Sequence, residues 1–183
     1  MVIHPKHRYQ IGISMVEILM TLVVVTFGLL ALAALQGKAH SAQLEAYQRA
    51  QALILLQDMV SRIEGNRAAA ASYATSTDVL GTGHTALDDC TTASDRAAQD
   101  KCEWSKALKG ASEISDDKNR GAMIDGRGCI EELAAGSRYQ VSVVWQGLSE
   151  LKEPDTTTCG SGAYTSRWRR AVTTLVVIPD LSS

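Results

Sequence analysis

The distribution of apolar residues along the chain is uneven, with one long uncharged stretch near the N-terminus. Residues 18–35 carry no charge and are interrupted only by Thr21, Thr26 and Gly28. Together with residues 13–17 the stretch exceeds twenty residues, and an α-helix of that length crosses the roughly 30 Å hydrocarbon layer. Residues 1–12 are basic and contain no acid, which retains them in the cytoplasm. The pattern predicts one membrane-spanning helix.

A second pattern follows after Gly37, where helix-forming residues alternate with apolar ones at spacings of three and four. Its apolar positions are Leu44, Tyr47, Leu53, Leu56, Met59, Val60 and Ile63. We expect an amphipathic helix with an i,i+4 ion pair between Glu45 and Arg49. Gly65 and Asn66 provide a helix stop. One helix over residues 13–64 is expected, and two helices separated at Gly37 are the alternative.

The C-terminal half contains segments rich in β-branched and aromatic residues, which favour strands. Strands are expected at residues 128–133, 138–147 and 171–178, a helix at 94–108, and loops at 115–127 and 155–162. The connections are too short for helical crossovers, so the sheet should be antiparallel. The predicted fold class is α+β, with a long N-terminal helix packed on a small antiparallel sheet.

Charge and composition exclude several classes of protein. The 18 Lys and Arg against 20 Asp and Glu give a net charge of -2, which argues against nucleic-acid binding by the whole surface. The one basic cluster is Arg167-Trp168-Arg169-Arg170, either a contact for a partner or anionic polymer, or a strand edge kept soluble by its charge. No catalytic motif is present, so neither an enzyme nor a cofactor or metal site is expected.

Four cysteines, Cys90, Cys102, Cys129 and Cys159, all follow the predicted span. Export would place them in an oxidising compartment, where disulfides form. Three pairings are possible. We favour Cys90 with Cys102 and Cys129 with Cys159, because each closes a local loop. A zinc site is the rival interpretation, but no C-x-x-C pair exists and His84 stands alone.

Glu17 is a carboxylate near the start of the apolar stretch, five residues after Gly12. An ionised acid in hydrocarbon is costly and requires a partner. The stretch Gly12-Ile13-Ser14-Met15-Val16-Glu17-Ile18-Leu19 resembles the class III signal of type IV prepilins and type II secretion pseudopilins. It departs from the usual residues at Ile13, Met15 and Val16, which all remain apolar. A secretory signal ending near Ala31-Leu32-Ala33, or an acid of no consequence at the membrane interface, are the alternatives.

The resemblance implies how the N-terminus is processed. A prepilin peptidase would cut between Gly12 and Ile13 and methylate the new amine. Glu17 would then pair with the amine of a neighbouring subunit and set the axial register. The implied segments are a leader at 1–12, a polymerisation helix at 13–36, the amphipathic half at 37–66 and a periplasmic headgroup at 67–183.

Within the family, the residues from Met15 to Leu19, the Val run and the strand at 138–145 resemble PilV-type minor pilins. This implies a non-enzymatic protein that joins other minor pilins and the major pilin through N-terminal helices. It would prime fibre assembly, support twitching and attachment, and contact a PilY-type tip adhesin. Its location would be the inner membrane, spanned once, and then the fibre. The alternatives are a type II secretion pseudopilin, a DNA-uptake pilin, or an anchored periplasmic enzyme or binding domain.

Overall fold

The computed structural model describes residues 12, 14–75, 78–84, 89–110, 114–115, 118–119, 123–165 and 167–179. The chain divides into two compact units, Met1–Ala42 and Gln43–Ser183. The first unit consists, in its described part, of the beginning of the long helix. The second unit contains the rest of the long helix and, among the described residues, the other helices and the strands.

The long helix α1 (Met15–Gly65) is continuous, so the alternative of two helices separated at Gly37 is wrong. A glycine inside a helix costs about 1 kcal/mol relative to alanine. That cost is small beside the uninterrupted run of good helix formers on both sides. After Gly65 the chain turns, with the Asn66 amide donating to the Ile63 carbonyl, and continues into the 3-10 helix η1 (Arg67–Tyr73).

The second helix, α2 (Arg96–Leu108), confirms the helix predicted at 94–108, although it begins two residues later. Its start is fixed by Asp95, whose side chain accepts a hydrogen bond from the Ala98 amide at 2.8 Å. Its end is marked by Gly110, whose φ of 76° is a left-handed conformation that suits glycine. The short 3-10 helix η2 (Cys90–Thr92) precedes it, capped by Asp89.

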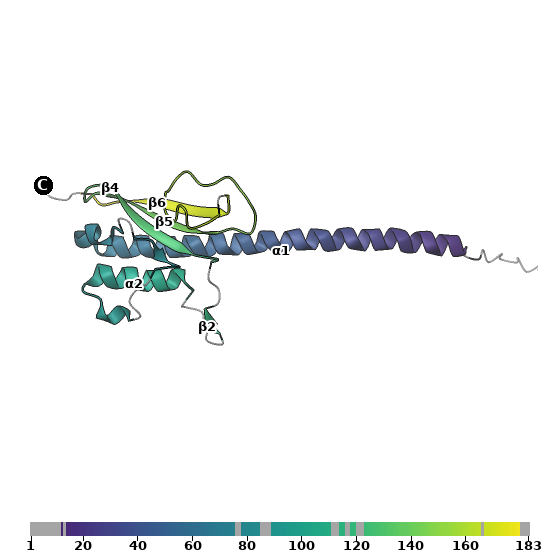
Figure 1. Ribbon diagram of the computed structural model, residues 1–183, viewed down its shortest axis with the longest axis horizontal. Helices are drawn as coiled ribbons and strands as arrows, with labels where there is room; N and C mark the ends of the chain where they lie inside the picture. The colour runs from purple at the N-terminus through teal and green to yellow at the C-terminus, as the bar shows by residue number, and fades with distance from the viewer. Residues whose placement is uncertain are drawn as a thin grey trace, which may run out of the picture. The chain divides into compact units, whose positions relative to one another are not determined.

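The strands form an antiparallel sheet in the order β1-β4-β5-β6, which confirms the predicted architecture (Figure 1). The strands are β1 (Leu80–Gly81), β4 (Arg127–Ala134), β5 (Arg138–Gln146) and β6 (Arg169–Val177). Two details differ from expectation. The expected loop at 115–127 overlaps the paired strands β2 (Ile114–Ser115) and β3 (Lys118–Asn119). The strand β6 begins two residues early, which places Arg169 inside the sheet.

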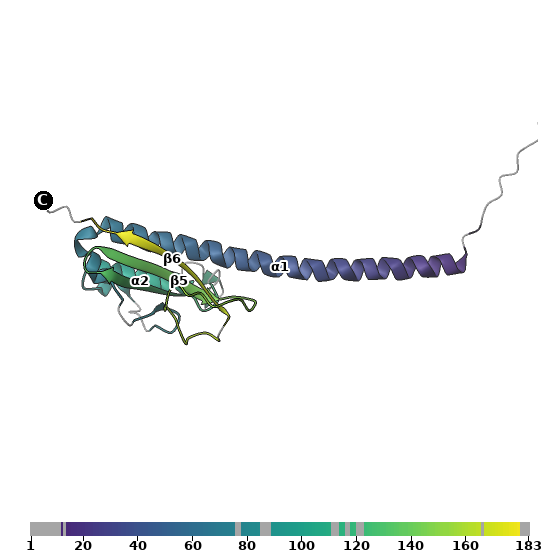
Figure 2. The same ribbon diagram turned by 90° about the horizontal axis from the view of Figure 1, so that it is seen from above.

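One apolar core joins the second half of α1 to α2 and the sheet, and α1 runs along the strands in both views (Figures 1 and 2). Its largest fully buried members are Trp104, Tyr73, Tyr139, Met59 and Ile63. Trp104 also donates through Nε1 to the Leu55 carbonyl at 2.8 Å, which satisfies its polar atom. Gly128 allows this packing, because a Cβ there would overlap the Trp104 ring.

Two disulfides staple the second unit. Cys90 is bonded to Cys102, which ties η2 to α2, and Cys129 is bonded to Cys159, which ties β4 to the loop before β6. This is the pairing that the local-loop argument favours. The described part of the chain contains no free cysteine.

We expect non-reducing peptide mapping of the purified chain to recover a Cys90–Cys102 and a Cys129–Cys159 peptide. The bonds close loops of 12 and 30 residues, so the chain-entropy model assigns each roughly 3 kcal/mol of stabilisation. Reduction should therefore lower the midpoint of urea unfolding. Free thiols, bound zinc or crossed pairs would contradict the assignment.

Candidate assembly site

The first half of α1 exposes its apolar side chains all round. Every described residue from Ser14 to Leu44 is exposed, and Phe27 and Leu30 are 68% and 69% exposed. Among the described residues, α1 is the one helix long and apolar enough to cross a membrane. An apolar surface of this extent requires lipid or other apolar helices to cover it.

The hydroxyl groups inside this apolar half are satisfied by the helix itself. Thr21 donates through Oγ1 to the Ile18 carbonyl, and Thr26 donates to the Val23 carbonyl, both at 2.8 Å. Such bonds remove the cost of placing a free hydroxyl in hydrocarbon. The two threonines therefore do not demand an external partner.

Glu17 differs from those threonines because it ends in a charge that the helix does not neutralise. It lies in the first turn of α1, where the helix dipole favours a carboxylate. Its backbone amide donates to the Ser14 carbonyl at 3.0 Å, while its carboxylate has no hydrogen bond or ion pair within the described segments. The exposed carboxylate is thus available to a cation from outside the chain.

Gly12 is exposed, and a Cβ added there would meet no atom within 4 Å. Neither space nor a left-handed backbone requires a glycine at this position. Ile13 and the basic residues before Gly12 lie outside the described residues, so the predicted cleavage junction is described on its Gly12 side alone.

Glu45 lies on α1 near the point where the second unit begins, and it connects the helix to the sheet. Its Oε1 accepts from the Leu148 amide at 3.0 Å, the Ser149 hydroxyl at 3.1 Å and Arg170 Nη2 at 3.2 Å. Burial raises the pKa of Glu45, but the hydrogen bonds and the Arg170 charge outweigh it and lower the pKa overall. The predicted Glu45–Arg49 pair is therefore wrong, because a partner far along the sequence holds this carboxylate.

The basic cluster at 167–170 is mostly internal, which corrects both expectations for it. Arg169 is buried and donates to the carbonyls of Pro154, Thr157 and Cys159. Arg170 binds Glu45, and a Cβ at Gly147 would collide with its guanidinium. Only Arg167, with a 65% exposed side chain, remains at the surface. These arginines bind the fold together and do not form a basic surface.

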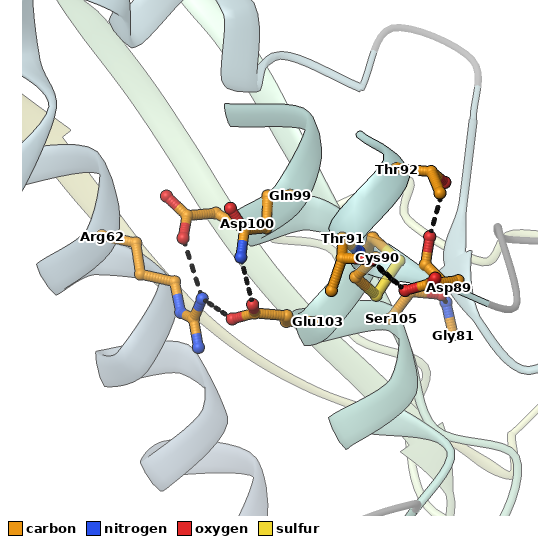
Figure 3. Close-up of a disulfide and its surroundings, with 11 residues drawn as sticks. Arg62, Gly81, Asp89, Cys90, Thr91, Thr92, Gln99, Asp100, Glu103 and Ser105 are labelled. Carbon is orange, nitrogen blue, oxygen red and sulfur yellow. Dashed lines mark hydrogen bonds and ion pairs between the residues drawn. A yellow bond between two sulfur atoms is a disulfide. The ribbon is translucent and has the colours of Figure 1, made fainter. Parts of the chain in front are cut away.

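A second charge cluster, centred on the buried Asp100 and not predicted from the sequence, joins α1 to α2. Arg62 Nη1 lies 2.9 Å from Asp100 Oδ1 and 2.7 Å from Glu103 Oε2. Figure 3 shows the Arg62 side chain pointing toward these two acids. The Tyr73 hydroxyl donates to the other oxygen of Asp100 at 2.5 Å, and Arg96 donates to both oxygens. The i,i+4 spacing of Arg96 and Asp100 is visible in the sequence, but the contact with Arg62, 38 residues away, is not.

These contacts shift the ionisation of the acids. Burial raises the pKa of Asp100, but hydrogen bonds from Tyr73, Arg62 and Arg96 outweigh it, so its pKa lies below the ordinary value. The Arg62 hydrogen bond likewise lowers the pKa of Glu103. A carboxyl group with a lowered folded pKa stabilises the fold above its unfolded pKa and loses that contribution as the pH falls through the folded value.

We therefore expect the free energy of unfolding to be constant near neutral pH and to fall below about pH 4, where unfolded Asp and Glu begin to bind protons. Urea unfolding followed between pH 7 and pH 2.5 measures this. Asp100→Asn should flatten the acid limb, whereas Asp155→Asn, at a side chain 80% exposed, should leave it unchanged. An unaltered acid limb in Asp100→Asn would contradict the role of this cluster.

The described residues contain no group of three or more His, Cys, Asp or Glu side chains placed to hold a metal ion. A cleft of about 510 Å³ lies beside the Cys129–Cys159 disulfide, lined by β4 and the loop at 158–163. Its one cation, Arg127, is paired with Asp125 at 3.0 Å.

Comparison with known proteins gives one family. A family model described as Tt1218-like, Type IV pilin Tt1218, matches residues 34–107, which is less than half of the chain. The matched part runs from the apolar half of α1 to the end of α2 and includes Arg62, Asp100 and the first disulfide. No curated protein and no solved structure matches the chain.

The pilin family is structural rather than catalytic, and a long apolar helix fits both membrane anchoring and a place in a pilus fibre. The match covers neither Glu17 nor the strands β4, β5 and β6, so these features are evidence independent of it. The apolar N-terminal helix, the α+β fold and the family match together support a type IV pilin.

Proposed function

We propose that this chain is a minor pilin of the PilV type, which joins other minor pilins to prime type IV pilus assembly. The major pilin would pack on the same N-terminal helices, and a PilY-type adhesin would be a partner at the tip. Before assembly the protein would span the inner membrane once with its second unit in the periplasm. Twitching motility and surface attachment would depend on it.

The observation that carries this proposal is Glu17, an unneutralised carboxylate at the start of an apolar helix exposed on every side. A fibre of laterally packed helices would cover the apolar surface and provide a cation for the acid. We propose that this cation is the methylated amine of Ile13 in a neighbouring subunit, made by cleavage after Gly12. A single-pass anchored enzyme would have no need of an acid in this position.

The test is the mass of the mature N-terminus, read from the protein purified from its native host. We expect it to begin at methylated Ile13. In Gly12→Val the prepilin peptidase would lack the glycine after which it cuts. Nearly all of the protein should therefore remain as the uncut precursor. Because a side chain at residue 12 meets no neighbouring atom, the fold of the second unit should be unaffected.

Gly37→Ala is the matched control, since a Cβ at that glycine also meets no atom within 4 Å and it lies far from the junction. Its precursor should mature normally. A mature wild-type protein that still begins with the basic residues 1–12 would contradict the proposal. Pilus counts and twitching in a strain lacking the protein then test the minor-pilin role, and a secretion defect with normal pili would instead indicate a type II secretion pseudopilin.

A further inference from the structure

The strand β6 forms one edge of the sheet, and half of its backbone groups point away from the sheet. Two backbone hydrogen bonds mark the ends of its pairing with β5. The Gly147 amide donates to the Trp168 carbonyl, and the Ile178 amide donates to the Ser137 carbonyl. In an antiparallel ladder these bonds alternate along the strand. The backbone amides and carbonyls of even-numbered residues in β6 therefore point toward β5, and those of odd-numbered residues point outward. The outward amides and carbonyls of residues 171, 173, 175 and 177 have no partner in the described part of the chain.

This edge lacks the features that usually block the approach of another strand. The register between β5 and β6 runs from Gln146–Arg169 to Arg138–Val177 without a bulge. Residues 171–177 include neither a charge nor a proline. Leu175 and Val177 are 52% and 62% exposed, on the same face as Thr173. An open and uncharged edge without a bulge is a template for a further strand.

The nature of these groups identifies what can cover them. A row of alternating N–H and C=O groups is matched by another polypeptide in the extended conformation, with apolar residues at every second position to cover Leu175 and Val177. Antiparallel pairing with the β6 strand of a second copy does not fit. The strand β6 and the second half of α1 run in the same direction (Figure 2), so antiparallel pairing of two β6 strands would point two membrane-anchored helices in opposite directions.

We propose that the free edge of β6 binds an extended, uncharged segment of another protein, which adds to the sheet as a fifth strand beside β6. The backbone of residues 171–177 supplies the hydrogen bonds, and the exposed side chains of Leu175 and Val177 supply the apolar contact. The residues of this edge belong to the second unit and not to the apolar N-terminal half of α1, so the edge would recruit a partner whether or not the chain enters a fibre.

The test is amide hydrogen exchange, measured by NMR on the full chain in nonionic detergent micelles. The probe is a nine-residue peptide of alternating threonine and valine with a lysine at each end. We expect saturating peptide to slow exchange of the Ala171, Thr173, Leu175 and Val177 amides about tenfold or more. The amides of Val172, Thr174 and Val176, already bonded to β5, should be protected in both states.

Thr173→Pro removes one outward amide without breaking a bond of the ladder, which an edge strand tolerates. It should weaken peptide binding at least about tenfold. Thr174→Val is the matched control, because residue 174 faces β5 through its backbone, and its affinity should equal that of the wild type. If Thr173→Pro reduces the melting temperature, Leu175→Lys, an exposed position, provides the second variant and should weaken binding similarly.

Three results would overturn the proposal. One is the absence of protection at millimolar peptide. Another is protection confined to residues outside β6. The third is protection of the outward amides in the absence of peptide, if this protection increases with protein concentration. Such a result would mean that a second copy of the chain occupies the edge.

Discussion

We expect Glu17→Ala to leave synthesis, membrane insertion and cleavage intact, and to lower the amount of the protein in sheared pili at least about tenfold. Removing the acid makes the helix more apolar, so insertion is not impeded. In the fibre, however, the amine of a neighbour would lose its counter-ion inside a helix bundle of low dielectric. Breaking a buried pair on one side costs about 3–5 kcal/mol, which is more than a tenfold change requires.

Two further variants separate charge from shape. Glu17→Gln keeps the size of the side chain and removes its charge, so it should fail to enter pili as Glu17→Ala does. Thr21→Ala is the matched control one turn along, because the Thr21 hydroxyl is already bonded to the Ile18 carbonyl. Quantitative immunoblots of sheared fibres and of membranes measure all of these. Wild-type incorporation of Glu17→Gln would contradict the proposed register role.

The elements that the sequence predicted correctly are those specified by local patterns. The helix α1 follows from composition and spacing, and α2 follows from helix-forming residues behind the capping Asp95. The strands β4, β5 and β6 are visible as β-branched runs, and short connections make them antiparallel. In each case the information lies within about ten residues, so no knowledge of the tertiary structure was needed.

The polar contacts between elements could not be predicted in this way. Glu45 binds Arg170, 125 residues away, in preference to Arg49 one turn along its own helix. Arg62 reaches Asp100 because α1 and α2 lie side by side in one core. A local ion pair on an exposed helix contributes only a few tenths of a kcal/mol, so tertiary contacts readily override it. The proposed assembly residues Gly12 and Glu17 differ from these contacts, because their fixed sequence offset suggests them without knowledge of the fold.

We expect Arg169→Ala to lower the free energy of unfolding of the second unit by about 3 kcal/mol. Its guanidinium lies 2.7 Å from the Cys159 carbonyl, 3.0 Å from the Thr157 and Pro154 carbonyls, and 3.1 Å from Glu153. Removing it would leave buried carbonyls without a donor, and each such group costs about 1–3 kcal/mol. The loop at 148–165 would remain attached through the Cys129–Cys159 disulfide, so the second unit should stay folded despite the lower free energy of unfolding.

The chain contains its own control for this prediction, two residues earlier. Arg167 is 65% exposed and lies 3.6 Å from Glu150, so Arg167→Ala should change the stability by less than about 0.5 kcal/mol. Urea unfolding in micelles, followed by the fluorescence of the buried Trp104 and Trp145, reports on the second unit in both variants. Equal free energies of unfolding for Arg169→Ala and Arg167→Ala would show that Arg169 contributes no more than a surface charge. A loss confined to Arg169→Ala would instead show that what looks in the sequence like one basic cluster is a buried clamp next to a solvated arginine.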